Sequence, residues 1–209
     1  MLKTLYRTIV EFVFPLAPEI REFQEMSPSE ILKQLPRSEH NIQDVHSLFA
    51  YQDDQVKQLI WEIKYYRNEK VARVAGELLA QIIMRNTEGD ASYLVMSVPI
   101  TDRRFRERGF NHTELLTRAT LKFLPNNFKF ENTTLHKIRH TRKQNSIEDR
   151  NERFSNIAGA FSVSNKSKIE NQNVVLLDDV VTTGATLGEV KKALLKAGAR
   201  RVFSFTIAH

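Results

Sequence analysis

Two adjacent acids, a glycine and several threonines lie between an expected strand and an expected helix near the C-terminal end of the chain. The acids are Asp178 and Asp179, and they follow residues 174–177, a continuous apolar run typical of a strand buried on both faces. From Leu187 to Ala197 the apolar residues recur at helical spacing. The acids therefore stand at the end of a buried strand, and a polar turn leads from them into a helix.

This junction favours a phosphorylated sugar as ligand. The first N–H groups of a helix lack partners within it, and the helix dipole adds about half a positive charge there, so an anion is stabilised. Gly184 and Ala185 let the backbone come close to a ligand. Hydroxyl groups for the same anion come from Thr182, Thr183 and Thr186. The two carboxylates can accept hydrogen bonds from sugar hydroxyls, at the strand end where open parallel sheets bind their ligands.

Each part of the junction also has a purely structural interpretation. Two acids at a strand end can be ordinary turn residues, and Thr182 or Thr183 can be a simple helix N-cap. The complete order of buried strand, double acid, threonine-glycine turn and amphipathic helix favours the functional interpretation.

A second apolar strand, expected over residues 93–100, also ends in a polar turn. The turn and its continuation contain Pro99, Ile100, Thr101, Asp102, Arg103 and Arg104, and then Arg106 and Arg108. Guanidinium groups form a fork of donors that suits the oxygens of a diphosphate. A solvated basic loop that contacts nucleic acid is the alternative, and the position directly after a strand favours the diphosphate.

Residues 136–153 carry six lysines and arginines against three acids, a net charge of +3. This composition predicts a mobile basic lid over a polyanionic substrate, because a lid must be soluble when open and must neutralise charge when closed. We expect Lys143 to reach the substrate from this lid. A solvated loop without a chemical role would have a similar composition.

The chain has 209 residues, no cysteine and a formal net charge of +6. The lack of cysteine excludes disulfides, a thiolate nucleophile and any cysteine-bound metal, and we assign no metal-binding residue. No apolar run is long enough to span a bilayer, and charged residues interrupt the apolar N-terminal stretch, so we expect a cytoplasmic protein without a membrane partner. The positive charge fits anionic ligands, whether polyphosphates or nucleic acid.

Four of the six prolines fall within residues 1–50. We interpret this segment as a helical N-terminal appendage, with short helices expected over residues 5–13 and after the start signal Ser27-Pro28-Ser29-Glu30. Over residues 51–209, stretches with helical spacing alternate with apolar strands. The sequence therefore predicts an α/β domain with a mostly parallel sheet and helices on both faces.

Residues 174–186 resemble the phosphoribosyl-pyrophosphate (PRPP) binding motif of type I phosphoribosyltransferases. The resemblance implies that Asp178 and Asp179 hold the ribose hydroxyls and that residues 182–186 bind the 5′-phosphate. It also implies that residues 99–103 lie near the diphosphate. We expect Mg²⁺ as cofactor, bound through PRPP.

Further motifs are spaced as in the ComF family, the competence-associated phosphoribosyltransferase-like proteins. They are Lys64-Tyr65, Val98-Pro99-Ile100, the run from Arg103 to Asn111, Arg142-Lys143-Gln144, Arg150-Asn151-Glu152-Arg153 and Ala160-Phe161. The resemblance extends from about residue 48 to the C-terminus. Many relatives begin with a cysteine-rich zinc-binding segment, and the region around Pro15 to Pro18 has no cysteine, so no zinc site is carried over.

The first function consistent with these residues is transfer of ribose 5-phosphate from PRPP to a nucleophile. Asp178 and Asp179 would orient the sugar and favour the positive charge that develops on it. Arg103 and Lys143 would stabilise the departing diphosphate.

The second function is binding without turnover. The ligand would be PRPP, a nucleotide or single-stranded DNA, in a protein that acts in DNA uptake, with Tyr65, Phe105 and Phe110 available for stacking on bases. The acceptor of a transfer reaction is not predicted, and an oligomer remains compatible with the sequence.

Overall fold

The computed structural model describes residues 23, 25–39, 42, 44–139 and 157–209. The helix expected over residues 5–13 and the predicted site residue Lys143 lie outside the described residues. Among the helices that are described, none is long and apolar enough to cross a membrane.

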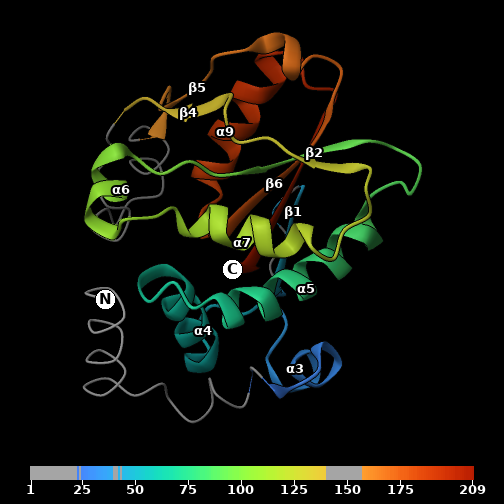
Figure 1. The fold of residues 1–209 in the computed structure, drawn as a ribbon, viewed down its shortest axis with the longest axis vertical. Helices are drawn as coiled ribbons and strands as arrows, with labels where there is room; N and C mark the ends of the chain where they lie inside the picture. The colour runs from blue at the N-terminus through green and yellow to red at the C-terminus, as the bar shows by residue number, and fades with distance from the viewer. Residues whose placement is uncertain (1–22, 24, 40–41, 43, 140–156) are drawn as a thin grey trace, which may run out of the picture.

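The centre of the structure is a sheet of five parallel strands (Figure 1). Their order is β1 (Val45–Phe49), β7 (Arg201–Ala208), β6 (Asn173–Val180), β2 (Tyr93–Ser97) and β3 (Phe128–Phe130). In the register of the central strands, Val175 lies between Val95 and Phe203. Because all five strands run in the same direction, the carboxyl ends of β6 and β2 lie at the same end of the sheet. These two strand ends carry the predicted site motifs.

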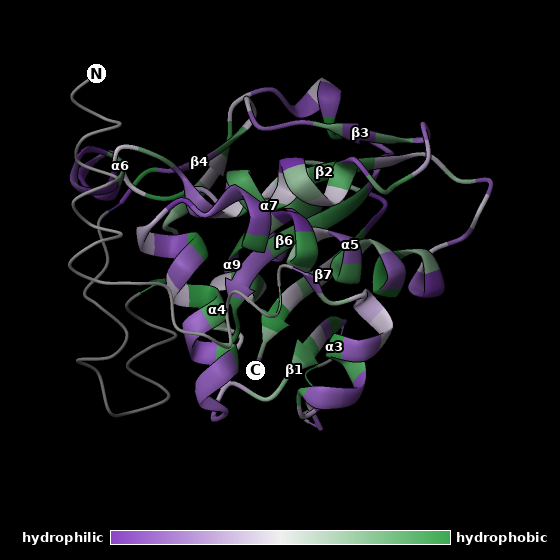
Figure 2. Ribbon diagram, turned by 60° about the horizontal axis from the view of Figure 1, so that its bottom comes forward, coloured by the Kyte–Doolittle hydropathy of each residue, from purple (hydrophilic) through white to green (hydrophobic). Residues whose placement is uncertain are grey.

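Helices cover both faces of this sheet, which confirms the predicted fold class. Along β6, Val175 and Leu177 join the apolar cluster on one face, while Val174 and Leu176 join the cluster on the other, as the two-residue period of a strand requires. The strand is apolar on both sides (Figure 2) because both faces are covered.

The first face is covered by α4 (Asp54–Tyr65), α5 (Glu69–Asn86) and α7 (His112–Leu121), with α3 (Pro28–Gln34) beside α5. Helices α5 and α7 approach closely at Gly76, where an added Cβ would lie 2.7 Å from the backbone nitrogen of Thr120. The helix start predicted at Ser27 is confirmed, because Ser27 and Glu30 form a capping box at the beginning of α3.

The second face is covered by α9 (Ala185–Lys196) and by a two-stranded antiparallel sheet. Its strands are β4 (Leu135–Lys137) and β5 (Phe161–Val163), and a short 3₁₀ helix spans Lys166–Lys168. The backbone N–H of Ile138 donates to the carbonyl of Ala160 at 2.9 Å, which extends this ladder beyond Lys137.

Two strands and one α-helix were not predicted from the sequence. They are β1, β3 and the seven-residue helix α6 (Asp102–Arg108), which stands where a basic turn was expected. β1 lies within the segment interpreted as an N-terminal appendage, yet it pairs along β7, and the hydroxyls of Ser47 and Thr206 lie 2.7 Å apart. The parallel sheet therefore includes residues from that segment.

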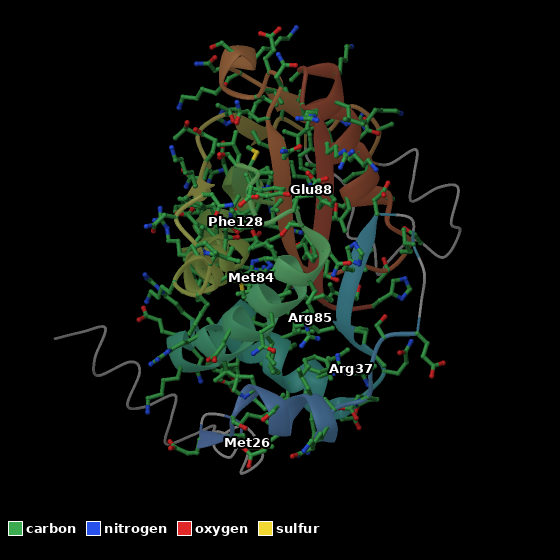
Figure 3. The ribbon with its side chains drawn as sticks, turned by 90° about the vertical axis from the view of Figure 1, so that its right-hand side faces the viewer. Met26, Arg37, Met84, Arg85, Glu88 and Phe128 are labelled. Carbon is green, nitrogen blue, oxygen red and sulfur yellow. The ribbon has the colours of Figure 1, made fainter. Side chains whose placement is uncertain are left out.

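At the end of the sheet opposite the predicted site, surface side chains contact each other. Arg201, at the start of β7, donates to Glu88 at 3.0 Å, and Glu88 follows α5 (Figure 3). The motifs of the predicted site lie at the other end of the sheet, where β6 and β2 end.

Candidate functional site

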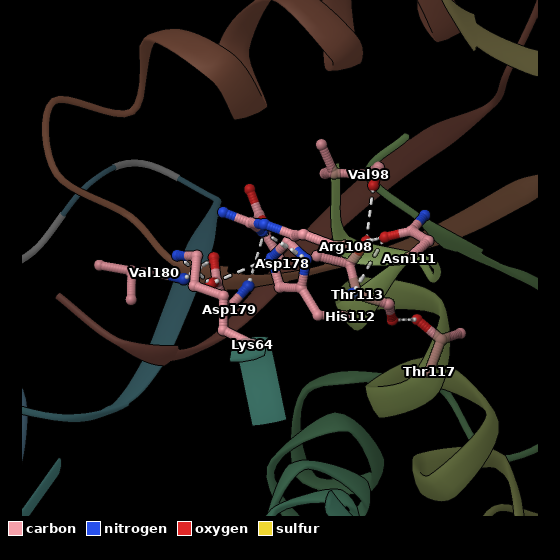
Figure 4. A network of polar contacts seen from close by, with 10 residues as sticks. All are labelled: Lys64, Val98, Arg108, Asn111, His112, Thr113, Thr117, Asp178, Asp179 and Val180. Carbon is pink, nitrogen blue, oxygen red and sulfur yellow. Dashed lines mark hydrogen bonds and ion pairs between the residues drawn. The ribbon is translucent and has the colours of Figure 1, made fainter. Parts of the chain in front are cut away.

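The ends of β6 and β2 are held together with the start of α7 (Figure 4). The backbone N–H of Val98 donates to the carbonyl of Leu177 at 2.9 Å, which extends the ladder one residue past β2. The hydroxyl of Thr113 donates to the carbonyl of Val98 at 2.6 Å. Asn111, predicted as a helix cap, accepts from the backbone N–H of Thr113 at 3.1 Å, which confirms that role. The N-terminus of α7 is thus fixed against both strand ends.

Asp179 is buried and points toward the face covered by α4 and α7. Its Oδ2 atom lies 2.6 Å from Nζ of Lys64 on α4 and 3.2 Å from Nε2 of His112 on α7. Its Oδ1 atom accepts the backbone N–H of Val180 at 2.8 Å. Asp179 therefore joins two helices to the central strand.

The hydrogen-bond partners of His112 fix its tautomer. Nη1 of Arg108 lies 3.1 Å from Nδ1 of His112, and a guanidinium can only donate, so Nδ1 accepts. The ring proton is then on Nε2, where it is donated to Asp179. Arg108 also lies over the ring of Tyr65, 5.1 Å from its centroid, so this chain of contacts runs from an exposed aromatic side chain to the buried acid.

The two adjacent acids are in different electrostatic states. Burial acts to raise the pKa of Asp179, but the charge of Lys64 and the hydrogen bond from His112 outweigh it, and the pKa lies well below its ordinary value. Burial acts to lower the pKa of Lys64, and the charge of Asp179 raises it above its ordinary value instead. Burial, followed by the charge of Asp179, raises the pKa of Asp178 well above its ordinary value. The proton of this pair is thus favoured on Asp178, and the negative charge on Asp179.

Asp178 and the turn after it form a small, shallow hollow that is open to solvent at the start of α9. It is lined by Asp178, Val180, Val181, Thr182, Gly184, Ala185, Thr186 and Leu187. Gly184 is the N-cap residue, with φ of 76°, and it offers no side chain to cap the helix. Thr183 stands beside the hollow, and its hydroxyl accepts the N–H of Ala185 at 3.4 Å. The structure therefore brings Asp178 together with the residues predicted to bind the 5′-phosphate.

The residues predicted to bind the diphosphate lie at the start of α6 and just before it, and they differ in burial. Thr101 is buried and caps the helix by accepting the N–H of Arg104 at 3.4 Å. Arg103 is exposed and pairs with Glu107 at 2.8 Å, while Arg104 and Arg108, one turn apart, are partly buried. Pro99 and Ile100 lie in the short connection between β2 and Thr101, and Asp102 is the exposed first residue of α6. The role predicted for Arg103 stays a prediction, and Arg104 is the more enclosed of the two.

The structure adds partners that sequence reasoning missed. No role was predicted for His112 from the sequence, and Lys64 was named only as part of a family motif. Lys137, on β4, lies close enough to Arg104 and Asp178 for their charges to act on it. The polar positions of Lys64 and His112 beside apolar helix stripes were visible in the sequence, but their common partner was not.

A resident metal does not fit the buried acid. Ligand atoms of His112, Asp178 and Asp179 lie within 4.8 Å of one another, which resembles a metal-binding cluster. However, Lys64 and His112 both contact Oδ2 of Asp179, so a positive charge and a hydrogen-bond donor occupy the position that a cation would take. The donor set fits a hydrogen-bonded ion pair.

Comparison with known proteins agrees with this arrangement. Residues 119–209 match the phosphoribosyl transferase domain. The chain is 31% identical over 147 residues to the DNA utilization protein YhgH of Salmonella typhimurium, across 69% of this chain and 63% of that protein. It is 28% identical over 161 residues to the competence protein ComFC of Streptococcus pneumoniae, across 77% of this chain and 66% of that protein. The chain belongs to the ComF family.

This ComF chain spans less than two thirds of the length of its Salmonella relative. A crystal structure of a hypoxanthine phosphoribosyltransferase from Staphylococcus aureus aligns with a TM-score of 0.40 at 13% identity, over 66% of this chain and 63% of that one. The phosphoribosyltransferase-like architecture of this ComF chain rests on the domain match and on its own parallel sheet with helices on both faces.

Substitution of Lys64 should reveal the importance of the buried ion pair. We expect Lys64→Met to lower the free energy of unfolding by about 3 kcal/mol, because it leaves Asp179 buried without its cation. The cost should fall markedly when Asp179→Asn is introduced as well. Thermal and urea unfolding measure both effects, and Lys57→Met, which removes an exposed ion pair from the same helix, should change stability little. Equal effects at the two lysines would contradict this account.

Substitution of Asp178 should stabilise the free protein. Because its folded pKa is raised, the ionised form disfavours folding, so stability is lost progressively as the pH rises above the unfolded pKa of about 4 and through the folded pKa. Asp178→Asn should therefore gain about 1 kcal/mol at pH 8 and less at pH 4.5. Unfolding measured across this pH range tests the sign, and a gain that does not change with pH would show that the ionisation of Asp178 is not its cause.

Proposed function

We propose that this chain binds PRPP with Mg²⁺ and transfers its ribose 5-phosphate group to a nucleophile. The observation that carries the proposal is the position of Asp178 in the hollow at the start of α9, next to Asp179, whose charge is balanced by Lys64 on the other face of β6. The hollow lies at the N-terminus of α9, where the helix dipole favours the 5′-phosphate, and Asp178 can accept hydrogen bonds from the ribose hydroxyls.

The residues fit a ligand that brings its own cation. Asp178 lines the hollow, and within the described part of the chain it has no ion pair, while Asp179 opposes its ionisation. Mg²⁺ bound through PRPP would supply positive charge on this side and would offset the charge of the leaving diphosphate. No residue of the chain is assigned as a direct ligand of the metal.

In the proposed reaction the bond between C1 of ribose and the diphosphate oxygen breaks, and the diphosphate leaves with the electron pair. The acceptor forms the new bond at C1. Asp178 becomes ionised as the sugar binds, so that its negative charge favours the positive charge developing on the ribose ring. Asp179 keeps Asp178 in place through the backbone, since its N–H donates to Oδ1 of Asp178 at 2.9 Å.

The proposal includes a cytoplasmic location. The absence of cysteine from the sequence and the nature of the proposed ligand support it.

Binding of PRPP can be tested by isothermal titration with and without Mg²⁺. We expect Mg²⁺-dependent binding that Asp178→Asn weakens at least tenfold, since it removes hydrogen bonds to a charged acceptor. Asp178 is the better target than Asp179, because Asp179→Asn would also leave Lys64 without its partner. The matched control is Asp90→Asn, which changes an exposed acid near the opposite end of the sheet. Unaltered binding by the Asp178 variant would remove the proposed site, and tight binding without diphosphate release in the presence of nucleobases would exclude transfer to a nucleobase.

A second candidate function is the binding of single-stranded DNA in DNA uptake. It is favoured by exposed aromatic side chains beside arginines on α4 and α6, and the names of two relatives, a DNA utilization protein and a competence protein, point the same way. Trp61 and Tyr65 contact each other with ring centroids 4.3 Å apart, and both are about half exposed. Arg108 lies over Tyr65, Arg67 lies over Phe110, and Phe105 is exposed on α6. Stacking surfaces next to cations are typical of single-strand binding.

The fluorescence of Trp61, the only tryptophan of the chain, gives a direct test of this surface. We expect oligo(dT) to quench this fluorescence. The affinity should fall steeply between about 50 and 200 mM salt, because contacts with phosphate groups weaken over this range. Tyr65→Ala should weaken binding about tenfold, while Tyr51→Ala, another exposed tyrosine, should leave it unchanged. Quenching that is insensitive to Tyr65 would argue against this face as the binding surface.

A further inference from the structure

The residues directly before β1 contact the helix that begins at the hollow. Whereas α3 packs on the first face of the sheet, Ile42 and Val45 pack against the apolar cluster of the second face, which includes residues of α9. A Cβ atom placed on Gly184 would lie 3.3 Å from Cγ2 and 3.5 Å from Cδ1 of Ile42. Ile42 therefore lies directly against the N-cap residue of α9, although it belongs to the segment interpreted from the sequence as an appendage.

A second contact joins the same segment to α9 about two helical turns further along. The carboxylate of Asp44 forms an ion pair with the ammonium group of Lys191. Asp44 has a φ of 62°, in the left-handed region that residues other than glycine rarely adopt. Its carbonyl accepts the backbone N–H of Ser204 on β7 at 3.1 Å. Asp44 is thus fixed to β7 through its backbone and to α9 through its side chain, and such contacts maintain an unfavourable backbone conformation.

We propose that Ile42 and Asp44 are positioning residues for the turn of residues 182–186 at the start of α9. This role rests on the proposed function for the identity of the ligand, because the turn is where the 5′-phosphate of PRPP would bind. Local side-chain caps contribute little to holding the turn. Gly184 has no side chain to cap the helix, and the hydroxyl of Thr183 accepts the N–H of Ala185 at 3.4 Å, which is long for a hydrogen bond.

Contacts from outside the turn therefore determine where it lies. Ile42 limits the movement of Gly184 toward β1, and the ion pair of Asp44 with Lys191 limits the displacement of the helix behind it. A binding site is effective when its groups are in place before the ligand arrives. The apparent affinity falls in proportion to the fraction of molecules in which the turn is in place.

The ion pair allows this role to be separated from simple electrostatics. Asp44→Asn removes a negative charge, so the change of charge alone would strengthen the binding of an anion. If Asp44 acts by holding α9, the same substitution weakens binding. The side chains of Lys191 and Asp44 are 30% and 46% exposed, so we expect a loss of about two- to threefold in affinity.

The test is isothermal titration of the full chain with ribose 5-phosphate, which has the 5′-phosphate but not the diphosphate. Asp44→Asn and Lys191→Met should each weaken binding, and the double variant should bind no more weakly than the weaker single variant, because the two residues share one contact. Lys192→Met is the matched control, since it removes the same charge from the next position of α9, where the side chain is 78% exposed. It should leave the affinity unchanged.

A second pair of substitutions tests the contact between Ile42 and Gly184. We expect Ile42→Ala to weaken ribose 5-phosphate binding, and Gly184→Ala to weaken it about tenfold, because alanine is strained in the left-handed conformation of this residue. The loss in the double variant should be smaller than the product of the single losses by at least about threefold. The reason is that truncation of the isoleucine makes room for the added methyl group.

Circular dichroism and thermal unfolding of each variant show that the affinities are measured on folded protein. A contact with a merely structural role lowers the melting temperature and leaves the affinity of the folded protein unchanged. Tighter or unchanged binding by Asp44→Asn, losses that multiply in both double variants, or no ribose 5-phosphate binding by the wild type would each overturn the positioning role.

The positioning role and the PRPP proposal can fail separately. Ribose 5-phosphate binding that depends on Ile42 and Asp44, in a protein that does not bind PRPP, would support the positioning role and refute the PRPP proposal. Mg²⁺-dependent PRPP binding that depends on Asp178 but is the same in the Ile42 and Asp44 variants as in the wild type would refute the positioning role alone.

Discussion

The ion pair between Lys64 and Asp179 is the interaction on which the candidate site depends. Two adjacent carboxylates at a strand end repel each other, and both could not be ionised in a partly buried position without compensation. Lys64 and His112 bind one of them, so its charge is satisfied inside the protein and the other is left for a ligand. The same contacts fix α4 and α7 against the end of β6, so the position of the site and the packing of the first face have one cause.

The two-residue period of β6 separates the roles of the acids. Val175, Leu177 and Asp179 follow one another on the face covered by α4 and α7, whereas Val174, Leu176 and Asp178 follow on the face of α9 and the β4–β5 hairpin. One acid therefore meets the interior lysine and histidine, and its neighbour meets the hollow at α9. A single strand presents a structural anion to one layer and a ligand-binding group to the other.

Much of this arrangement could be predicted from the sequence. The apolar run before Asp178, the helical stripe after Gly184 and the cap at Asn111 are local signals, and local signals decide strands, helices and caps. β1 was missed because its five residues include a histidine and a serine and only part of it is buried, and α6 because a helix of charged residues has no apolar period. The partners of Asp179 could not be predicted, since they meet only when distant helices pack on the same strand.

Arg108 connects the two surfaces for which functions are proposed. Its guanidinium contacts Nδ1 of His112 and lies over the exposed ring of Tyr65, so it belongs both to the network of the acids and to the aromatic face. A nucleic acid phosphate that attracted Arg108 would compete with His112 for the same donors. Loss of that donor would remove the contact that orients the ring of His112, whose Nε2 atom lies 3.2 Å from Oδ2 of Asp179. DNA binding at the aromatic face would therefore act on the network that holds Asp179, because Arg108 belongs to both.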